Sequence, residues 1–555
     1  MTERMSPREV AEAENRLARF NSERDRIIAT VKRRVVDAHV SAAEDDPECS
    51  LEYVLNEVAF AEIKRYEKSH GKEAKKKLSK WKDLALRLGR MSESEKRREL
   101  EQLVGWHAQD IAGNFNPKVY RFANDIIPSA LSFLLAPISS VREGLDALGG
   151  LGRQVQVEGA LDLVRAAADS GTLVFAPTHT SNLDSIVLGF GLSRVGLPPV
   201  TYGAGKNLFS NPLISYFMQN LGAYRVDRRL RFGLYKEVLK EYSTVLLERG
   251  FHSLFFPGGT RCRSGRVEQR LKLGLLGTSL AAFGNTQIEG ISNRRIFIVP
   301  VTINYRLVLE AETLVEDYLA ETGKSRYIIE DDEFSRIGRV LEFARKLLAH
   351  GSSVIIRVGQ PMDVFGNRVN DDLDSLDHAG RILDSRSLLW NANDEVSRDA
   401  QRDAVYTRRT GRALAQAFRR ETVFLSTHLV CRSVMDEVVR RTQITDLYKL
   451  LRVPTSAVKI DVTATLKGID RLRERLIESP QWGQLDSALT ERSAEQVLDD
   501  GLRSLSTYHT RAVLTRVGDS IRIGYGKLLF YYQNRMSHIP SESEPPQRDN
   551  SGRAQ

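Results

Sequence analysis

A histidine and an aspartate in the stretch APTHTSNLDSIVLG, residues 176–189, have the side-chain types of a general base and its orienting partner. His179 precedes Asp184 by five positions. On one continuous helix this spacing would separate the two side chains by about 140° around the axis, so they could not meet. They can meet if His179 ends a strand and Asp184 lies in the first turn of the helix that follows. The carboxylate would then bond one imidazole nitrogen and raise the basicity of the other.

The same residues also have a purely structural explanation. Ser181 and Asp184 have the spacing of a capping box, in which Asp184 would only satisfy the start of a helix. With ten histidines in the chain and an ordinary aspartate content, about half of one such pair is expected by chance. The pair alone therefore leaves both interpretations open.

A glycine- and arginine-rich stretch, FPGGTRCRSGR at residues 256–266, could hold an anion. Glycines let backbone amides approach an anion closely, and arginine forks match phosphate oxygens. The chain has no GxxxxGK[ST] pattern, so this loop is not a nucleotide P-loop. The structural alternative is a surface turn with solvated arginines. Cys262 has the chemistry of an acyl-accepting nucleophile, but no base stands beside it in the sequence.

Two further stretches have suggestive residue types. LGAYRVDRRLR, residues 221–231, is a glycine–aromatic turn that runs into four arginines. IFIVPVTINY, residues 296–305, is typical of a buried strand, and its Pro300 could wall an apolar slot. Taken singly, each stretch is better explained by structure than by function.

The middle of the chain predicts the elements that would position these residues. Short β-rich runs at 172–179, 200–204, 252–257, 294–305 and 352–359 alternate with amphipathic helical segments. This alternation is typical of an α/β fold with a largely parallel sheet flanked by helices. In such sheets the chemistry collects in loops at the carboxyl ends of the strands. The motifs above all fall where a β-rich run ends.

Helical texture on both sides of this core predicts four regions. We expect a helical N-terminal region at 1–118, the α/β core at 119–366, a helical C-terminal region at 367–536 and a disordered tail at 537–555. The lysine-rich run at 67–82 is interpreted as a solvated helical face, with a surface held against anionic lipid as the functional alternative.

Composition limits the class of protein. The 555 residues, 41% of them hydrophobic, predict a globular chain of roughly two or three domains. Three isolated cysteines form neither a disulfide framework nor a zinc pattern, which favours the cytosol.

The charged N-terminus predicts no secretory signal. The apolar segment 126–141 is shorter than the roughly 18 residues of a spanning helix and contains Pro128 and Pro137. We expect it to lie buried or in a membrane interface, with no transmembrane helix.

Together and in this order, the four stretches resemble the glycerolipid acyltransferase family, whose members join glycerol-phosphate hydroxyls to acyl thioesters. The flanking helical regions resemble the larger bacterial glycerol-3-phosphate acyltransferases. The family's first block, H-x4-D, is matched by His179 and Asp184, and its second, G-x-[FY]-x-x-x-R, by Gly222, Tyr224 and Arg228. The third block, FPEGTRSRSG, resembles residues 256–265. The fourth, a hydrophobic strand with VP, is matched by Val299 and Pro300.

The resemblance implies roles for these residues. His179 would be the general base that deprotonates the acceptor hydroxyl, and Asp184 would orient it, with no acyl-enzyme, metal or other cofactor. The substrate-binding residues would be Lys206, Gly222, Tyr224, Arg228, Gly259, Thr260, Arg261, Arg263 and Pro300. The chain departs from the family at Gly258, where the third block has glutamate, and at Cys262, where it has serine. The carboxylate of that glutamate is either absent from this chain or supplied by another residue, so the identity of the acceptor stays open.

The function expected from this resemblance is acyl transfer from acyl-CoA or acyl-carrier protein to glycerol 3-phosphate. Segment 126–141 and basic patches would dock the enzyme peripherally on an anionic membrane surface, at the cytoplasmic face of the inner membrane. One alternative acceptor is lysophosphatidate or another lysophospholipid. A different alternative, suggested by the net charge of +9, is a non-catalytic basic protein that binds anionic membrane or nucleic acid. No helix-turn-helix, zinc-finger or RNP signature supports a nucleic-acid partner.

Overall fold

The computed structural model describes residues 16–46, 49–122, 155–206, 209, 212–291, 293–322, 354–453, 458–507 and 509–540. The segment 126–141, for which we expect a buried or interfacial position, lies outside these residues, as does the expected tail from 541 onward. The first residues of that tail, 537–540, are ordered instead, and Ile539 is buried. Within the described ranges, none of the helices combines the length and apolar character needed to cross a membrane.

A seven-stranded sheet forms the centre of the protein, with the strand order β1-β7-β6-β2-β5-β3-β4. All neighbouring strands run parallel except β6 and β7. The largely parallel sheet expected from the β-rich runs is therefore confirmed. The strands are β1 (Val155–Gly159), β2 (Gly171–Pro177), β3 (Thr201–Gly205), β4 (Ala223–Val226), β5 (Ser253–Leu254), β6 (Arg295–Tyr305) and β7 (Val354–Val358).

Helices cover both faces of this sheet, as the side chains of β2 show. All seven residues of β2 are buried, as expected for a central parallel strand. Because alternate side chains of a strand point to opposite faces, Leu173 and Phe175 join one hydrophobic cluster with α8 (Leu161–Ser170) and α9 (Asp184–Arg194). Val174 and Ala176 join another cluster with α12 (Leu273–Ile288) and α15 (Ala400–Glu421).

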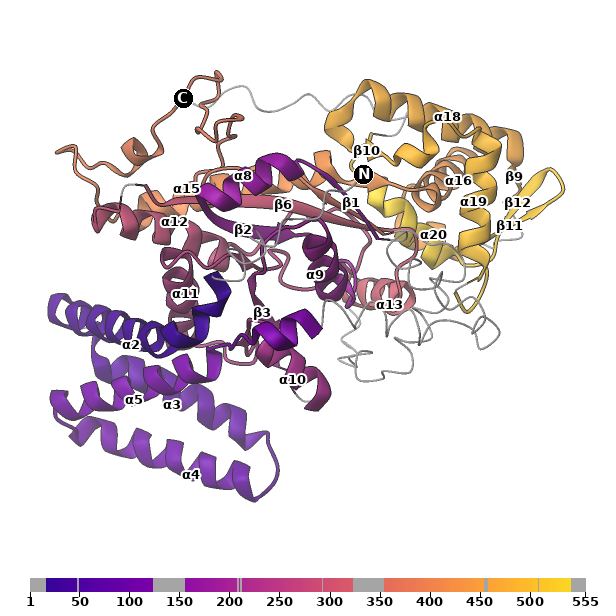
Figure 1. The fold of residues 1–555 in the computed structure, drawn as a ribbon. Coiled ribbons are helices and arrows are strands. Elements are labelled where there is room, and N and C mark those ends of the chain that lie inside the picture. Colours follow the sequence, from indigo (N-terminus) through magenta and orange to yellow (C-terminus); the bar gives the residue numbers. More distant parts are fainter. Residues whose placement is uncertain are drawn as a thin grey trace.

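The N-terminal region is helical, as expected. Its helices are α2 (Phe20–Asp45), α3 (Leu51–Glu67), α4 (Lys72–Arg87) and α5 (Glu93–Ile111). Apolar side chains of α2, α3 and α5 share one cluster with α11 (Gly233–Glu248) of the core. Arg34 of α2 adds an ion pair to Glu248, with 2.8 Å between Nη1 and Oε1. The N-terminal helices are therefore packed onto the core, and α4 lies outermost (Figure 1).

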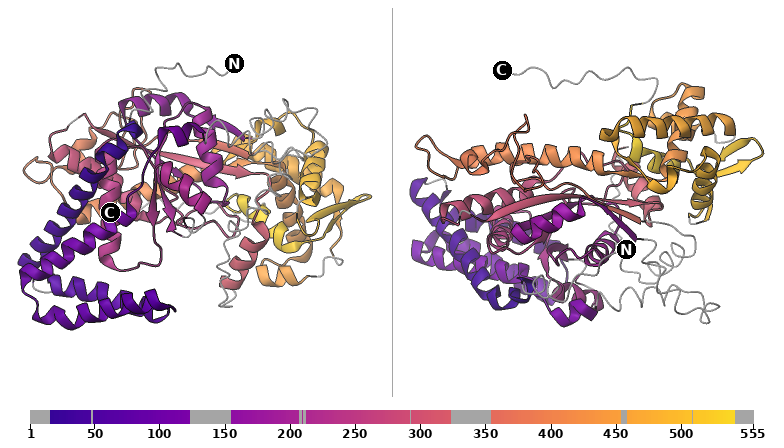
Figure 2. Two further views of the ribbon diagram at one scale, coloured as in Figure 1. Left: turned by 60° about the horizontal axis from the view of Figure 1, so that its bottom comes forward. Right: turned by 45° about the horizontal axis from the view of Figure 1, so that its top comes forward.

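The part of the C-terminal region that follows α15 lies at the opposite side of the core from the N-terminal helices, whereas α15 packs against the sheet (Figures 1 and 2). Its helices are α16 (Ser426–Thr442), α17 (Leu447–Arg452), α18 (Val462–Glu478), α19 (Ala494–Thr507) and α20 (Gly526–Gln533). It also contains two small sheets, made by β8 (Val423–Phe424) with β10 (Gln484–Leu485), and by β9 (Ile460–Asp461), β11 (Leu514–Val517) and β12 (Ser520–Ile523). The sequence did not predict these strands, because runs of two to four residues are too short for a clear alternating pattern.

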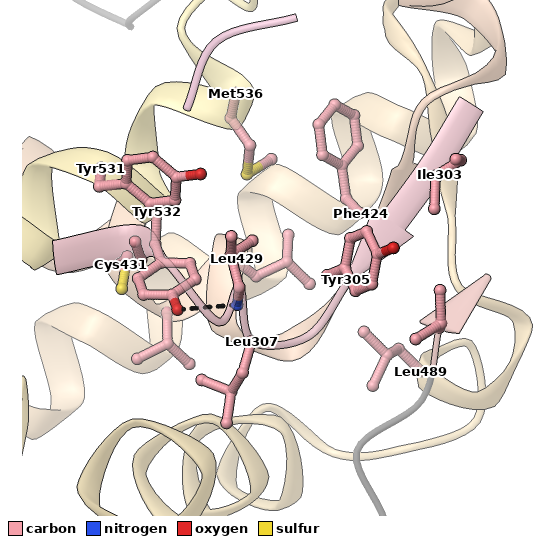
Figure 3. Packing of buried hydrophobic residues seen from close by; sticks show 14 of the residues in the cluster. Ile303, Tyr305, Leu307, Phe424, Leu429, Cys431, Leu489, Tyr531, Tyr532 and Met536 are labelled. Atoms are coloured by element: carbon pink, nitrogen blue, oxygen red, sulfur yellow. Dashed lines mark hydrogen bonds between the residues drawn. The ribbon is translucent and has the colours of Figure 1, made fainter. Parts of the chain in front are cut away.

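The carboxyl end of β6 is covered by this C-terminal region. Figure 3 shows Tyr305 and Leu307 packed among Leu429 of α16 and Tyr532 of α20. The Tyr532 hydroxyl accepts a hydrogen bond of 3.2 Å from the Val308 amide. The region after the α/β core therefore closes one side of the loops that follow the strands. The remaining helices, α10 (Pro212–Asn220) and α13 (Ala311–Thr322), follow β3 and β6.

Candidate active site

The structure brings His179 and Asp184 together in the arrangement that their spacing requires. Strand β2 ends at Pro177, and α9 begins at Asp184, so His179 lies in the turn between them. His179 Nδ1 is 2.8 Å from Asp184 Oδ2. The aspartate is fully buried, whereas the histidine side chain keeps 16% of its surface exposed. The pair is thus a solvent-reachable imidazole backed by a buried carboxylate.

The Asp184 carboxylate is held by four donors. Its Oδ2 accepts from His179 Nδ1 and from the backbone amides of Thr180, at 2.6 Å, and Ser181, at 2.9 Å. Its Oδ1 accepts from the Tyr305 hydroxyl at 2.7 Å. Because Nδ1 must carry the proton that it donates to the carboxylate, Nε2 of the neutral ring keeps its lone pair. The arrangement therefore leaves Nε2 as the imidazole nitrogen that can accept a proton.

The structure bears out part of the capping interpretation. Leu183 occupies the N-cap position of α9 and makes no side-chain capping bond. The Asp184 carboxylate nevertheless accepts from the Ser181 amide, as the acidic residue of a capping box does, and also from the Thr180 amide. The Ser181 hydroxyl accepts from the Leu183 amide at 3.2 Å and donates to Glu310 Oε2 at 2.9 Å. The turn is therefore built by both side chains, and Asp184 is left directed at the imidazole.

Tyr305 is a site residue that the sequence did not single out, although it ends the strand run at 296–305. It is fully buried at the end of β6, the strand beside β2 in the sheet. Burial and the neighbouring Asp184 raise the pKa of Tyr305 well above its ordinary value. The phenol therefore remains protonated and remains a donor to the carboxylate.

The loop 256–266 is tied to His179 through its backbone. The Cys262 amide donates to the His179 carbonyl at 2.7 Å, and the ring of Phe256 stacks on the imidazole at 4.3 Å between centroids. Gly259 has a φ of +73°, in the left-handed region that favours glycine. Thr260 beside it is exposed. The loop expected to bind an anion thus lies directly against the histidine.

Two of the three arginines expected to hold phosphate, those of the loop 256–266, are paired with carboxylates. Arg261 Nη1 is 3.4 Å from Oε1 of the buried Glu310, which also accepts from the Asn182 amide at 2.8 Å. Arg263 Nη1 is 2.9 Å from Glu321 Oε2 on α13. Glu310 therefore connects the histidine turn to the arginine loop.

Cys262 has the wrong environment for a nucleophile. Burial raises the pKa of its thiol, which lowers the fraction of thiolate. Its Sγ lies 3.0 Å from the carbonyl oxygen of Arg266. These surroundings do not activate the Cys262 thiol.

The residues expected from the second block lie in structural positions. Tyr224 is fully buried between the core and the N-terminal helices, with its ring 5.7 Å from that of Tyr242. Gly222 has a φ of +84°, and a Cβ there would come within 3.2 Å of the Val200 carbonyl. Arg228 is exposed. In this structure the glycine and tyrosine shape and pack the strand start rather than line a binding surface.

Lys206 and Pro300 are also engaged by the fold. Lys206 Nζ is 2.7 Å from Asp110 Oδ2 on α5 and 3.8 Å from Asp227 Oδ2. It therefore ties the N-terminal helices to the core. Pro300 is buried within β6 opposite Ala176 of β2. Its ring would lie 2.9 Å from a Cβ at Gly359, so it packs against the end of β7.

Two buried ionisable groups join the site from distant parts of the chain. Glu268 Oε1 accepts from the His179 amide at 2.7 Å. Arg535, near the end of the C-terminal region, is fully enclosed and donates to Asn304 Oδ1 at 3.2 Å. A small cavity beside the site is lined by Thr180, Tyr305 and Arg535, among others. Neither group had a local sequence signal, because each reaches the site only through tertiary packing.

In the part of the chain that the structure describes, no group of three or more His, Cys, Asp or Glu side chains is arranged to hold a metal ion.

The fold and the site define an α/β protein in which a strand-end turn holds a partly exposed histidine against a buried aspartate. Residues 154–304 match the model of the Acyltransferase family.

Two relatives are named glycerol-3-phosphate acyltransferase. The chain is 29% identical over 235 residues to the protein of Pseudomonas paraeruginosa, a match covering 42% of this chain and 24% of that one. It is 30% identical over 246 residues to the protein of Actinobacillus succinogenes, covering 44% and 28%. The chain thus spans about a quarter of the length of these relatives.

Among solved structures, the chain matches the 1-acyl-sn-glycerophosphate acyltransferase of Thermotoga maritima. The identity is 16%, over 44% of this chain and 73% of that one, with a TM-score of 0.22.

Proposed function

We propose that the protein is an O-acyltransferase that moves a fatty acyl group from acyl-CoA or acyl-carrier protein to a hydroxyl of glycerol 3-phosphate. The observation that carries this proposal is the 2.8 Å contact between His179 Nδ1 and the buried Asp184 carboxylate, inside the part of the chain that matches the Acyltransferase family model. The names of the Pseudomonas and Actinobacillus relatives support the choice of acceptor.

In the proposed reaction, Nε2 of His179 takes the proton of the acceptor hydroxyl while the hydroxyl oxygen attacks the thioester carbonyl carbon. The carbon–sulfur bond then breaks, and the departing thiolate takes the proton from the imidazolium. The products are an ester and a free thiol, and the histidine returns to its neutral form. Asp184 stabilises the imidazolium between these two steps.

The acceptor phosphate would be held by the loop that contacts His179. Arg261 and Arg263 supply the charge, while Gly259 and Thr260 shape the turn. Each guanidinium has further N–H donors beyond the one that bonds its carboxylate partner. Arg228 is a further candidate by its charge. Lys206 would have to give up its bond to Asp110 in order to bind phosphate.

A peripheral position on an anionic membrane surface, at the cytoplasmic face of the inner membrane, is part of the proposal. Helix α4 supports it, because its lysines are exposed on the outermost element of the N-terminal region: Lys72, Lys75, Lys76, Lys77, Lys80 and Lys82. Lysines near an anionic surface each contribute about 1 kcal/mol of attraction.

The test is acceptor-dependent thiol release by the purified 555-residue chain. With acyl-CoA or acyl-carrier protein as donor, glycerol 3-phosphate should support turnover, and lysophosphatidate or no acceptor should not. His179→Ala should lower the rate by about 100- to 10,000-fold, the usual contribution of a general base. Turnover with lysophosphatidate and not with glycerol 3-phosphate would show that the acceptor is lysophosphatidate. The absence of turnover, together with binding to anionic vesicles or DNA, would favour a non-catalytic protein.

A further inference from the structure

Position 258 lacks a side chain, and the structure shows what fills the space. A Cβ built on Gly258 would lie 2.4 Å from Glu268 Oε2, 2.7 Å from Cδ and 3.0 Å from Oε1. Cβ atoms do not approach other atoms so closely. The carboxyl group of Glu268 therefore occupies the volume into which any side chain at position 258 would extend.

The same carboxyl group holds the backbone of His179. Glu268 Oε1 accepts from the His179 amide at 2.7 Å, and the His179 carbonyl accepts from the Cys262 amide at 2.7 Å. Both backbone polar groups of the histidine are thus bonded by the stretch 262–268. A displacement of about 1 Å at a reacting group can cost 100-fold in rate, so this support bears directly on the position of the imidazole.

The second oxygen of Glu268 has an unusual environment. The side chain is 9% exposed, and Oε2 has no hydrogen-bond partner among the described residues. Burial raises the pKa of Glu268 to about 8, against the opposing effects of the His179 amide and Arg535. The charged or titratable groups that face it are Arg535, Asp184 and Cys262. At neutral pH the group is therefore largely an uncharged carboxylic acid.

We propose that Glu268 is a positioning residue of this active site, and that it supplies from position 268 the carboxyl group that the FPEGTRSRSG block places at position 258. Two carbon–carbon bonds of about 1.5 Å carry the carboxyl carbon of a glutamate roughly 2.5 Å from its Cβ. The carboxyl carbon of Glu268 lies 2.7 Å from the Cβ position of residue 258. A glutamate at 258 can therefore bring its carboxyl group to the same place. Only one of the two positions can hold a glutamate there, and either carboxyl group could accept from the His179 amide.

The decisive experiment exchanges the two positions. Glu268→Ala removes the acceptor of the His179 amide and should lower kcat roughly 100-fold, with less change in the KM for glycerol 3-phosphate. Gly258→Glu alone forces two carboxyl groups into one space and should also be impaired. The double variant Gly258→Glu/Glu268→Ala should recover kcat to within about tenfold of the wild type. A folded double variant no more active than Glu268→Ala would overturn the proposal, as would a Glu268→Ala enzyme of wild-type kcat.

Two conservative variants test the same role if Glu268→Ala does not fold. Glu268→Gln retains an acceptor oxygen for the His179 amide and should keep kcat near the wild type at pH 7. Glu268→Met has a similar length but no such acceptor and should be impaired. Equal kcat values in these two variants would contradict the positioning role. Glu248→Ala is the matched control, because Glu248 is equally exposed and bonds Arg34 and Asn285 instead. It should lower stability and leave kcat unchanged.

A measurement without substrate tests the positioning role of Glu268 separately from the proposed function. The predicted effects on kcat rest on that function. Hydrogen exchange of the His179 amide, followed in ¹⁵N-labelled protein, should be slow in the wild type, in Glu268→Gln and in the double variant. It should be at least about fivefold faster in Glu268→Ala and Glu268→Met, the factor that corresponds to a lost hydrogen bond of roughly 1 kcal/mol. Wild-type protein that lacks acyl transfer but shows this pattern would refute the proposed function and leave the role of Glu268 standing. Identical exchange in all variants would refute the role itself.

Discussion

Replacing Asp184 by asparagine removes one negative charge beside His179 and leaves the shape of the turn in place. Three donors converge on Oδ2, from His179, Thr180 and Ser181, and one from Tyr305 reaches Oδ1. An asparagine with its carbonyl oxygen at the Oδ2 site keeps the first three bonds. Its amino group then faces the Tyr305 hydroxyl, which can rotate to accept. The variant is therefore expected to fold.

The catalytic cost follows from the lost attraction between the carboxylate and the imidazolium. Unit charges about 4 Å apart interact by about 4 kcal/mol at an effective dielectric constant of about 20. At 1.36 kcal/mol for each tenfold change in rate, kcat should fall about 1,000-fold in Asp184→Asn. The KM for glycerol 3-phosphate should change little, because Asp184 is fully buried behind the histidine.

The assay is initial-rate thiol release by wild-type and Asp184→Asn protein, with thermal unfolding as the control for the fold. A folded variant whose kcat stays within tenfold of the wild type would refute the role of Asp184 in stabilising the imidazolium. A variant that no longer folds would refute the hydrogen-bond substitution argued above.

The remaining predictions concern Tyr305 and the buried titratable groups. Tyr305→Phe removes one hydrogen bond to a charged group, worth about 1.5–3 kcal/mol, so kcat should fall roughly 10- to 100-fold; a loss as large as that of Asp184→Asn would contradict this ranking. Burial lowers the pKa values of His252 and His428 to about 3, and the unfolded chain takes up these protons below about pH 6.5. Stability should therefore fall between pH 6.5 and 4 in urea titrations, and a flat profile would contradict it. Glu268 acts in the opposite direction, because its pKa is about 8 in the folded protein. The unfolded state loses this proton at lower pH than the folded state. The contribution of Glu268 to the free energy of unfolding therefore declines as the pH rises from about 4.5 to 8. Glu268→Gln should accordingly be more stable than the wild type above pH 8 and gain nothing near pH 4.5; equal pH profiles of the two proteins would show that Glu268 is not buried as described.

The central sheet and the histidine turn could be predicted because their signals are local. Each β-rich run records its own burial, and the five-residue spacing of His179 and Asp184 allows only a strand end followed by a helix start. The partners of the pair could not be found in this way. Tyr305 lies 121 positions from Asp184, and Glu268 lies 89 positions from His179. They reach the site because β6 pairs with β2 and the arginine loop folds back.

Residues within a matched block do not all lie beside the histidine turn, as the second block shows. The block correctly marked a turn that requires glycine at 222, but the side chain of Tyr224 faces the hydrophobic cluster with α11 and the N-terminal helices. Lys206 had the right charge, yet its partner Asp110 comes from an N-terminal helix that sequence spacing alone could not bring next to it. Which face of a short strand meets a distant helix is decided by tertiary packing, and no local pattern records it.

The most direct measurement is glycerol-3-phosphate-dependent thiol release by the purified protein and by its His179→Ala variant. Acyl transfer by an Asp184-oriented histidine predicts release that depends on both the acyl thioester and glycerol 3-phosphate, and a loss of about 100- to 10,000-fold in the variant. Wild-type rates in His179→Ala, or no dependence on glycerol 3-phosphate, would contradict it.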